Sequence, residues 1–115
     1  MRAVRVRTYD EQPATDDIET PGAPDSGQLA IEVAAVGVGS WDVGVATGRL
    51  ARFVDLEPPF VMGAELAGRI AEVGPDAEGF AVGDRIIANP GIIGAWAARV
   101  NIAADACGPA PAALD

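Results

Sequence analysis

Hydrophobic and polar residues follow each other in short patterns along this chain, and most of the patterns have the period of a β-strand. Val4 and Val6 alternate with Arg5 and Arg7, which predicts a strand with one face in water. The chain turns apolar over residues 29–38, and its β-branched residues are typical of a strand buried on both faces. Further strands are predicted near Ile18 and over 66–73, 85–88 and 96–102.

The segments between these strands are rich in Gly, Pro and Asp, which predicts turns and irregular connections. Residues 12–28 read as a surface connection, and 49–60 as an irregular segment closed by Pro58-Pro59. Ser40 or Asp42 can cap a short helix that runs through Thr47 and ends at Gly48. After residue 102 we expect no further element, because the tail contains Pro109, Pro111 and mainly Ala.

Six short strands without a long amphipathic helix predict a mainly β fold, either an antiparallel barrel or a sandwich. The 14 glycines agree, because corners and bulges of a small barrel need residues that adopt positive φ. A doubly wound α/β sheet is disfavoured, since it needs longer helices between its strands. With 115 residues, the sequence predicts a single domain over 1–115.

Composition narrows the classes of function. The net charge of −9 would repel a phosphate backbone, so we expect no nucleic-acid partner. No apolar run approaches the roughly 20 residues of a membrane span, so we expect no membrane partner and a cytoplasmic location. The single Cys107 cannot form an intramolecular disulfide. The chain contains no histidine, which removes the usual zinc ligand and the usual general base.

One stretch carries a specific motif. Residues 59–74 read P-F-V-M-G-A-E-L-A-G-R-I-A-E-V-G, and G-D-R-I follows at 83–86. The pattern resembles the N-terminal GroES-like domain of the medium-chain dehydrogenase/reductase superfamily, also called the alcohol dehydrogenase N-terminal domain, and the likeness extends over nearly the whole chain. The resemblance implies a partly open antiparallel β-barrel with one or two short helices.

The resemblance also locates the metal and substrate positions. In zinc-dependent members, the positions of Gly39 and Ala64 carry ligand cysteine and histidine, and that of Trp41 carries a hydroxyl; only Asp42 is kept. We therefore expect no metal, and a likeness to the zinc-independent quinone oxidoreductases and enoyl reductases. That branch commonly has Asn at the position of Gly39 and often Tyr at the position of Gly44.

Five residues are candidates for binding a small-molecule substrate, and no catalytic residue is identified. They are Ser40, Trp41, Asp42, Phe53 and Glu65. Asp42 and Glu65 read either as an acid or base in a desolvated cleft or as groups that cap turns and pair with arginines. Trp41 reads either as a ligand contact or as core filler, and Phe53 either as part of a mobile cover or as an ordinary packing residue.

The sequence predicts no complete dinucleotide site. Gly37 and Gly39 begin a G-x-G-x-x-G pattern, but Asp42 stands at the third glycine. NAD(P)H is thus implied by the resemblance only, and we expect this chain alone to bind no cofactor and to transfer no hydride.

Two main hypotheses about function remain. In the first, the chain is the substrate-side domain of an NAD(P)H-dependent reductase. The chain itself lacks a Rossmann domain. It is completed by a nucleotide-binding domain or subunit, or it self-associates through the face that would otherwise meet that domain. In the second, it is a free-standing small-molecule binding protein or a non-redox enzyme such as a cyclase or isomerase, with Gly39, Gly44 and Ala64 widening the cleft. A weaker third reading is a structural partner that covers the apolar face of another protein.

Overall fold

The computed structural model describes residues 1–114 and shows a mainly β domain with one α-helix. The elements in chain order are β1 (Arg2–Val6), β2 (Ala14–Asp17), β3 (Gln28–Val36), α1 (Ser40–Ala46), β4 (Phe60–Val61), β5 (Leu66–Val73), β6 (Arg85–Ala88), β7 (Arg99–Ala103), a 3-10 helix (Ala104–Ala106) and β8 (Cys107–Pro109). Among these, no helix is long and apolar enough to cross a membrane.

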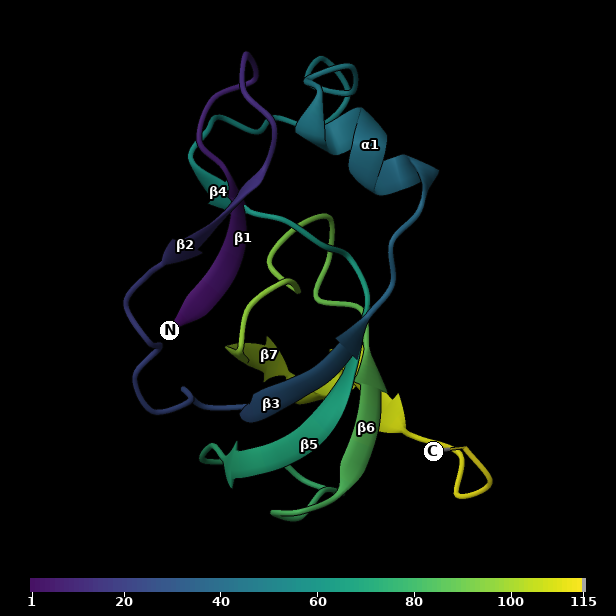
Figure 1. Ribbon diagram of the computed structural model, residues 1–115. Helices are drawn as coiled ribbons and strands as arrows, with labels where there is room; N and C mark the ends of the chain where they lie inside the picture. Colours follow the sequence, from purple (N-terminus) through teal and green to yellow (C-terminus); the bar gives the residue numbers. More distant parts are fainter. Residues whose placement is uncertain (115) are drawn as a thin grey trace.

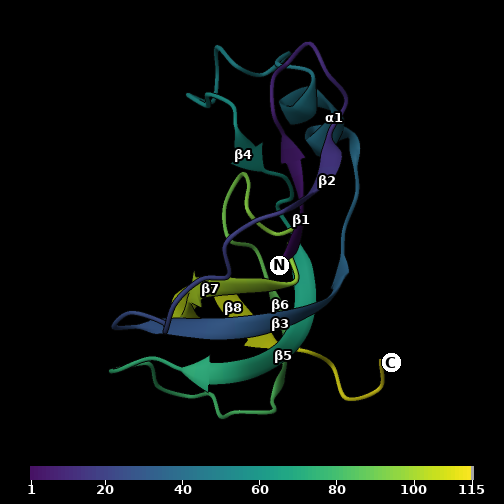
Figure 2. The same cartoon turned by 60° about the vertical axis from the view of Figure 1, so that its left-hand side comes forward.

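The strands form two antiparallel sheets (Figure 1). The smaller sheet has the order β2-β1-β4, and the larger one has the order β7-β3-β5-β6-β8. The larger sheet curls strongly, as the turned view shows (Figure 2). This arrangement confirms the predicted fold class, a partly open antiparallel barrel with one short helix.

Each sheet contributes to its own hydrophobic cluster. The larger cluster is built around side chains of β3, β5 and β6, including Leu29, Ile70 and Ile86, which are almost completely buried. The smaller cluster lies between the smaller sheet and α1 and contains Val6, Val45, Phe60 and Met62. The larger cluster fills the interior of the larger sheet. The smaller cluster packs α1 against the smaller sheet.

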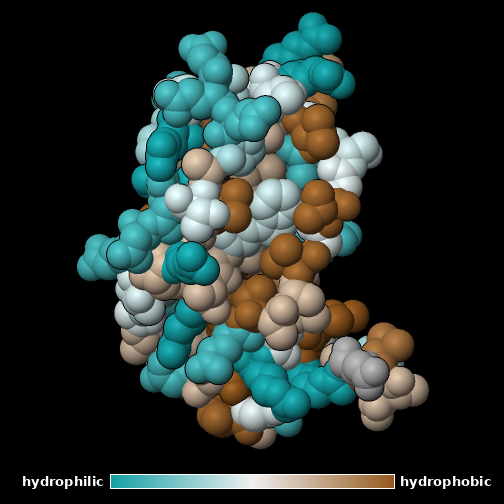
Figure 3. Space-filling view, viewed as in Figure 1, coloured by the Kyte–Doolittle hydropathy of each residue, from teal (hydrophilic) through white to brown (hydrophobic). Residues whose placement is uncertain are grey.

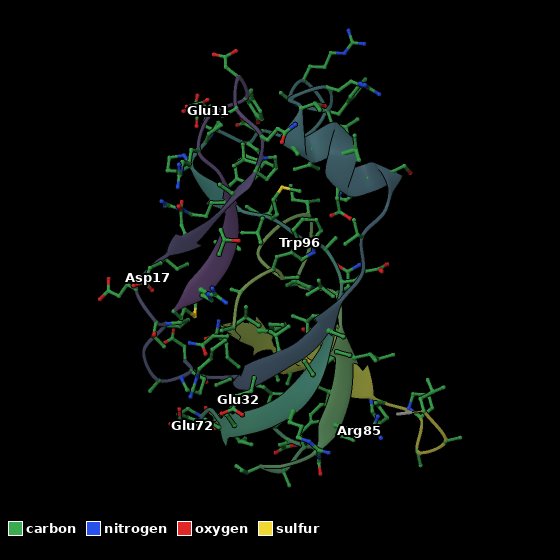
Figure 4. The ribbon with its side chains drawn as sticks, viewed as in Figure 1. Glu11, Asp17, Glu32, Glu72, Arg85 and Trp96 are labelled. Carbon is green, nitrogen blue, oxygen red and sulfur yellow. The ribbon has the colours of Figure 1, made fainter. Side chains whose placement is uncertain are left out.

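Trp96 packs against both clusters and connects them. Its side chain lies between the two sheets (Figure 4), and its indole Nε1–H donates a 3.2 Å hydrogen bond to the carbonyl oxygen of Gly37. Gly63 has φ +102°, and an added Cβ there would overlap the indole ring of Trp96. The indole therefore occupies the space that a side chain at residue 63 would need.

The predictions for β5 and β6 are confirmed with the same bounds, and the one for β3 is right only in part. Leu29, Ala30 and Ile31 are buried on both faces, whereas residues 34–36 are exposed. The reason is that β7 pairs with β3 only as far as Glu32, so the second half of β3 extends beyond its neighbour. Register shifts between β3 and β5 accompany this change.

The last third of the chain differs more from the prediction. Strand β7 begins at Arg99, three residues later than expected, because residues 96–98 pair with β1 instead. Ala97 forms the bridge to Ala3 in that pairing. Strands β4 and β8 were not predicted; β4 has two residues, and β8 contains Gly108-Pro109 and pairs with β6.

The helix α1 follows the sequence prediction closely. It begins at Ser40 and its last residue is Ala46, but the N-cap residue is Gly39 rather than Ser40 or Asp42, and Asp42 lies at the third position of the first turn. Thr47 forms the C-terminal cap, and Gly48 follows with φ +75°, the left-handed conformation that favours glycine after a helix.

Candidate functional site

A hollow of about 520 Å³ lies at the N-terminal end of α1. Three segments form it: the link from β3 into α1, the residues just before β5, and the loop after β6. Six of the residues that line it also belong to the motifs identified in the sequence: Gly39, Ser40, Trp41, Asp42, Ala64 and Glu65. Four of the five candidate residues from the sequence are thus brought together in one place.

Asp42 is the only buried charged residue among residues 1–114, with 7% of its surface exposed. Its Oδ2 accepts a 2.8 Å hydrogen bond from the backbone N–H of Gly39, the N-cap residue, so the Asp42 carboxylate reaches back to cap the first turn of α1 as in a capping box. Its Oδ1 is buried without a hydrogen-bond partner. The structure therefore confirms that Asp42 caps the turn. Its Oδ1 remains available to accept a hydrogen bond.

Glu65 reaches the hollow from the residue before β5, and its position depends on Gly37. The backbone N–H of Gly37 donates to the carbonyl oxygen of Glu65 at 3.3 Å. A Cβ on Gly37 would lie 2.5 Å from Oε2 of Glu65, so a larger residue at this position would make the carboxylate at the end of this exposed side chain move aside. Glu65 is exposed, and no ion pair with an arginine is found for it within the described residues.

Trp41 closes one side of the hollow. Its indole Nε1–H donates a 3.4 Å hydrogen bond to the carbonyl oxygen of Ile92, so the ring bridges α1 and the loop after β6. With 39% of its surface exposed, the ring presents an apolar surface to solvent. Ser40 lies beside it, exposed at the first position of the helix.

Two positions that the sequence associated with the cleft lie elsewhere. Phe53 is in the irregular segment after α1, 72% exposed, and the guanidinium of Arg52 lies 5.0 Å from its ring centre. It does not line the hollow. Gly44 is buried within α1, where an added Cβ would lie 3.0 Å from the side chain of Leu50. The expectation that Gly44 widens the cleft is therefore wrong, because its missing side chain serves the packing of α1.

The residues of this site do not fit the zinc ion of the zinc-dependent members. Gly39 has no side chain, and a Cβ built on it would meet nothing within 4 Å. Ala64 supplies no ligand atom, and Oδ2 of Asp42 is already used by the helix cap. Residues 1–114 contain no group of three or more His, Cys, Asp or Glu side chains that could hold a metal ion. Tetrahedral zinc sites need three or four such ligands.

A dinucleotide phosphate does not fit at the start of α1 either. Phosphates bind helix N-termini through free backbone N–H groups. Here the Gly39 N–H is occupied by Asp42, whose carboxylate would also repel an anion.

A second hollow of about 560 Å³ adjoins the first and shares Gly37, Glu65 and Asn89 with it. Apart from the shared residues, its walls are mainly apolar side chains of β3, β5 and β6, including Val36, Leu66 and Ile87. Figure 3 shows apolar side chains gathered along the hollowed side of the molecule between α1 and the C-terminal end. The two hollows together change from polar near α1 to apolar near β6.

Sequence reasoning missed the loop after β6 that forms the outer wall. Asn89, Gly91 and Ile92 line the first hollow, and Oδ1 of Asn89 accepts from the N–H of Gly91 at 2.9 Å. The Asn89-Pro90-Gly91 sequence after a predicted strand is a turn signal. Its proximity to α1, however, depends on the curl of the sheet, which no local pattern encodes.

Comparisons with known proteins agree with the geometry. Sorbitol dehydrogenase from Bacillus subtilis is 42% identical over 78 residues, which are 65% of this chain and 22% of that protein. NAD-dependent alcohol dehydrogenase from Sulfurisphaera tokodaii is 35% identical over 95 residues, 78% of this chain and 27% of that protein. The chain therefore spans about a quarter of the length of these curated relatives.

Two solved structures show the same fold over the whole chain. A probable oxidoreductase from Mycobacterium abscessus has a TM-score of 0.89 and 34% identity, and this chain covers 36% of it. Escherichia coli quinone oxidoreductase, solved with NADPH, has a TM-score of 0.86, 23% identity and 35% coverage, and shows the fold alone. The sequence itself matches the alcohol dehydrogenase GroES-like domain over residues 25–112, so the chain belongs to this family, the N-terminal domain of medium-chain dehydrogenases and reductases.

Proposed function

We propose that this chain is the substrate-side domain of a zinc-independent, NAD(P)H-dependent oxidoreductase of the quinone oxidoreductase or enoyl reductase type. A nucleotide-binding domain or subunit outside residues 1–115 would supply the cofactor, and the cofactor would supply the hydride. In this proposal the present chain binds and orients the substrate and excludes water from it.

The observation that supports zinc independence most strongly is that Gly39 and Ala64 stand at two positions that carry zinc ligands in zinc-dependent members. Both line the same hollow, and neither supplies a ligand atom. The curated relatives include alcohol and sorbitol dehydrogenases as well as a quinone oxidoreductase from Triphysaria versicolor. The choice between these types therefore depends on the residues of the site rather than on overall similarity.

The adjoining hollows support an uncharged substrate with an apolar part. Neither hollow is lined by Lys or Arg, and Asp42 and Glu65 would repel an anionic group. Trp41, Val36 and Ile87 offer apolar surface for a flat or extended molecule. An unsaturated ketone or a quinone meets these conditions.

The proposal can be tested on the chain alone. Isotope-labelled protein is titrated with 2-cyclohexen-1-one, and backbone amide shifts are followed by NMR. We expect shifts at Ser40, Trp41 and Glu65, weak or no binding of NADPH, and no retention of zinc after dialysis against a competing chromogenic chelator. Stoichiometric zinc, or enone shifts confined to another face, would contradict the proposal.

One observation also favours the alternative function, a free-standing small-molecule binding protein or a non-redox enzyme. Gly39 borders open space and Ala64 lines the same hollow, so the cleft is wider and has fewer polar groups than one filled by larger side chains. This alternative predicts tight ligand binding by the isolated chain. It also predicts no gain in activity when a nucleotide-binding domain is added.

A further inference from the structure

One oxygen of the buried carboxylate in the first hollow is not used by the fold. Asp42 lines that hollow, with 7% of its surface exposed. Its Oδ2 accepts from the Gly39 N–H, and its Oδ1 is buried without a hydrogen-bond partner among residues 1–114. Buried polar atoms usually have at least one partner, because leaving them unpaired is costly. The unpaired Oδ1 therefore indicates a ligand that brings the missing donor.

The side chains around the hollow do not supply this donor. Trp41 already uses its indole Nε1–H in a 3.4 Å hydrogen bond to a backbone carbonyl oxygen. Ala64 has no polar side-chain atom, and neither Lys nor Arg lines the hollow. Ser40 and Asn89 line it and have side chains that can donate, but neither bonds to Oδ1 of Asp42. The helix cap fixes the carboxylate, and its second oxygen is left for a bound group.

The charges around Oδ1 favour a neutral donor. Glu65, the second carboxylate of the hollow, is exposed and has no ion pair within the described residues. Two carboxylates repel an anionic ligand group. An ammonium group has the opposite charge, but it must lose its water to reach a buried oxygen, and removing water from an ion is expensive. A hydroxyl costs less to desolvate and donates one O–H, which is the group that Oδ1 lacks.

A carbonyl oxygen does not suit this position. A carbonyl oxygen and Oδ1 are both acceptors, so the two repel each other at hydrogen-bond distance. The reacting carbonyl of an unsaturated ketone or a quinone must therefore lie elsewhere in the hollow, near a donor such as the hydroxyl of Ser40 in the first turn of α1. The exposed part of the Trp41 ring offers apolar surface to the carbon skeleton that carries both groups.

We propose that the substrate carries a hydroxyl group in addition to its reacting carbonyl, and that this hydroxyl donates to Oδ1 of Asp42. The substrate class is then a hydroxy-substituted unsaturated ketone or quinone, with its apolar remainder against Val36 and Ile87 in the adjoining hollow. Asp42 sets specificity, because it binds a donor and rejects a ligand that has only acceptors at this position. This inference rests on the proposed function, which names the ketone or quinone but not its second polar group.

The test compares three ligands that differ in one group: 2-cyclohexen-1-one, its 4-hydroxy derivative and its 4-methoxy derivative. Each is titrated into isotope-labelled protein at pH 6, where the raised pKa of the Cys107 thiol keeps it protonated and slow to add to the enone. Dissociation constants come from the backbone amide shifts of Ser40, Trp41 and Glu65. We expect the hydroxy compound to bind about tenfold more tightly than the methoxy compound, the value of roughly one hydrogen bond to a charged acceptor.

Asp42→Asn changes the chemistry at the same place. The amide oxygen can keep the cap on Gly39, which puts the Nδ2 donor where Oδ1 stood. We expect the hydroxy and methoxy compounds to bind this variant with equal affinity. Asp84→Asn is the matched control, because Oδ2 of Asp84 also caps a turn, through a 2.9 Å hydrogen bond from the N–H of Ala81, but Asp84 does not line the hollow. We expect this control to keep the tenfold preference.

The outcomes separate this inference from the proposed function. If 2-cyclohexen-1-one binds in the hollow but the hydroxy and methoxy compounds bind the wild type equally well, the inference is wrong and the proposed function stands. A tenfold preference that Asp42→Asn retains would also overturn the inference. Binding of none of the three ligands in the hollow would contradict both. If Asp42→Asn does not fold, the comparison of the two derivatives on the wild type still decides.

Discussion

The contact between Gly63 and Trp96 leads to a quantitative prediction about stability. Gly63 combines a positive φ of +102° with a position where an added Cβ would lie 2.5 Å from Nε1 of Trp96 and even closer to Cδ1. Gly63→Ala therefore has two costs. The positive φ costs about 1–2 kcal/mol for a residue with a Cβ, and overpacking against the indole costs a further 1–3 kcal/mol or so. We expect a total loss of about 2–5 kcal/mol in the free energy of unfolding.

A double-mutant cycle separates the two costs. Trp96→Ala removes the indole that the new Cβ would meet, and by itself costs about 3 kcal/mol, the lower end for a large aromatic, because Trp96 is only half-buried. In the Trp96→Ala background, Gly63→Ala should cost only the φ contribution of about 1–2 kcal/mol. The coupling energy between the two sites is then about 1–3 kcal/mol.

Gly94 provides the matched control for the cycle. Its φ of +106° is nearly the same, but a Cβ there would meet nothing within 4 Å. Gly94→Ala should therefore cost only about 1–2 kcal/mol, with or without Trp96. Urea unfolding followed by far-UV circular dichroism measures all of these variants. Equal losses for Gly63→Ala and Gly94→Ala, or a coupling energy near zero, would refute the reasoning.

Three further predictions concern single groups. Asp16 binds Arg7 and Arg5, and these hydrogen bonds lower the pKa of its carboxyl to about 2. The contribution of Asp16 to stability is therefore complete above about pH 4 and is lost as the pH falls through about 2. Urea midpoints from pH 5 to pH 2 should fall more steeply for the wild type than for Asp16→Asn, and parallel profiles would contradict this. Asp42→Ala removes the helix cap and should lower the free energy of unfolding in urea by about 0.5–2 kcal/mol. Asp42→Asn keeps an acceptor oxygen and should lower it less. The reverse order would exclude capping as the role of Asp42. Burial, with a contribution from Asp105, raises the pKa of the Cys107 thiol. At pH 8 this thiol should therefore react with a disulfide reagent more slowly than free cysteine, and it should reach the rate of free cysteine only in urea. Equal rates for the folded protein and free cysteine would contradict this.

The parts of the fold that could be predicted from sequence are those with a local cause. Strands β5 and β6 are bounded by Gly and Pro turns on a clear apolar pattern, and their limits are confirmed. The turn at Gly83-Asp84 follows the same logic, since Oδ2 of Asp84 accepts a 2.9 Å hydrogen bond from the N–H of Ala81. The helix α1 was predicted despite weak propensity, because Gly48 marks its end.

The parts that could not be predicted depend on contacts between distant segments. Residues 96–98 look like the start of a strand, but pairing with β1 separates them from β7. Strand β8 has little propensity of its own and forms because β6 offers a free edge. The candidate site shows the same division: Ser40, Trp41, Asp42 and Glu65 came from motifs, whereas the Asn89–Ile92 wall depends on the curl of the sheet.

The most direct test of the proposed function is the activity of a chimera. Residues 1–115 replace the corresponding domain of Escherichia coli quinone oxidoreductase, whose solved structure shares this fold. The measurement is NADPH-dependent reduction of 1,4-benzoquinone in the presence of a strong zinc chelator, with NADPH fluorescence as the check that the nucleotide-binding part is folded. We predict quinone-dependent NADPH oxidation that the chelator does not change. Turnover that requires added zinc, or no turnover by a chimera that binds NADPH normally, would contradict the proposal.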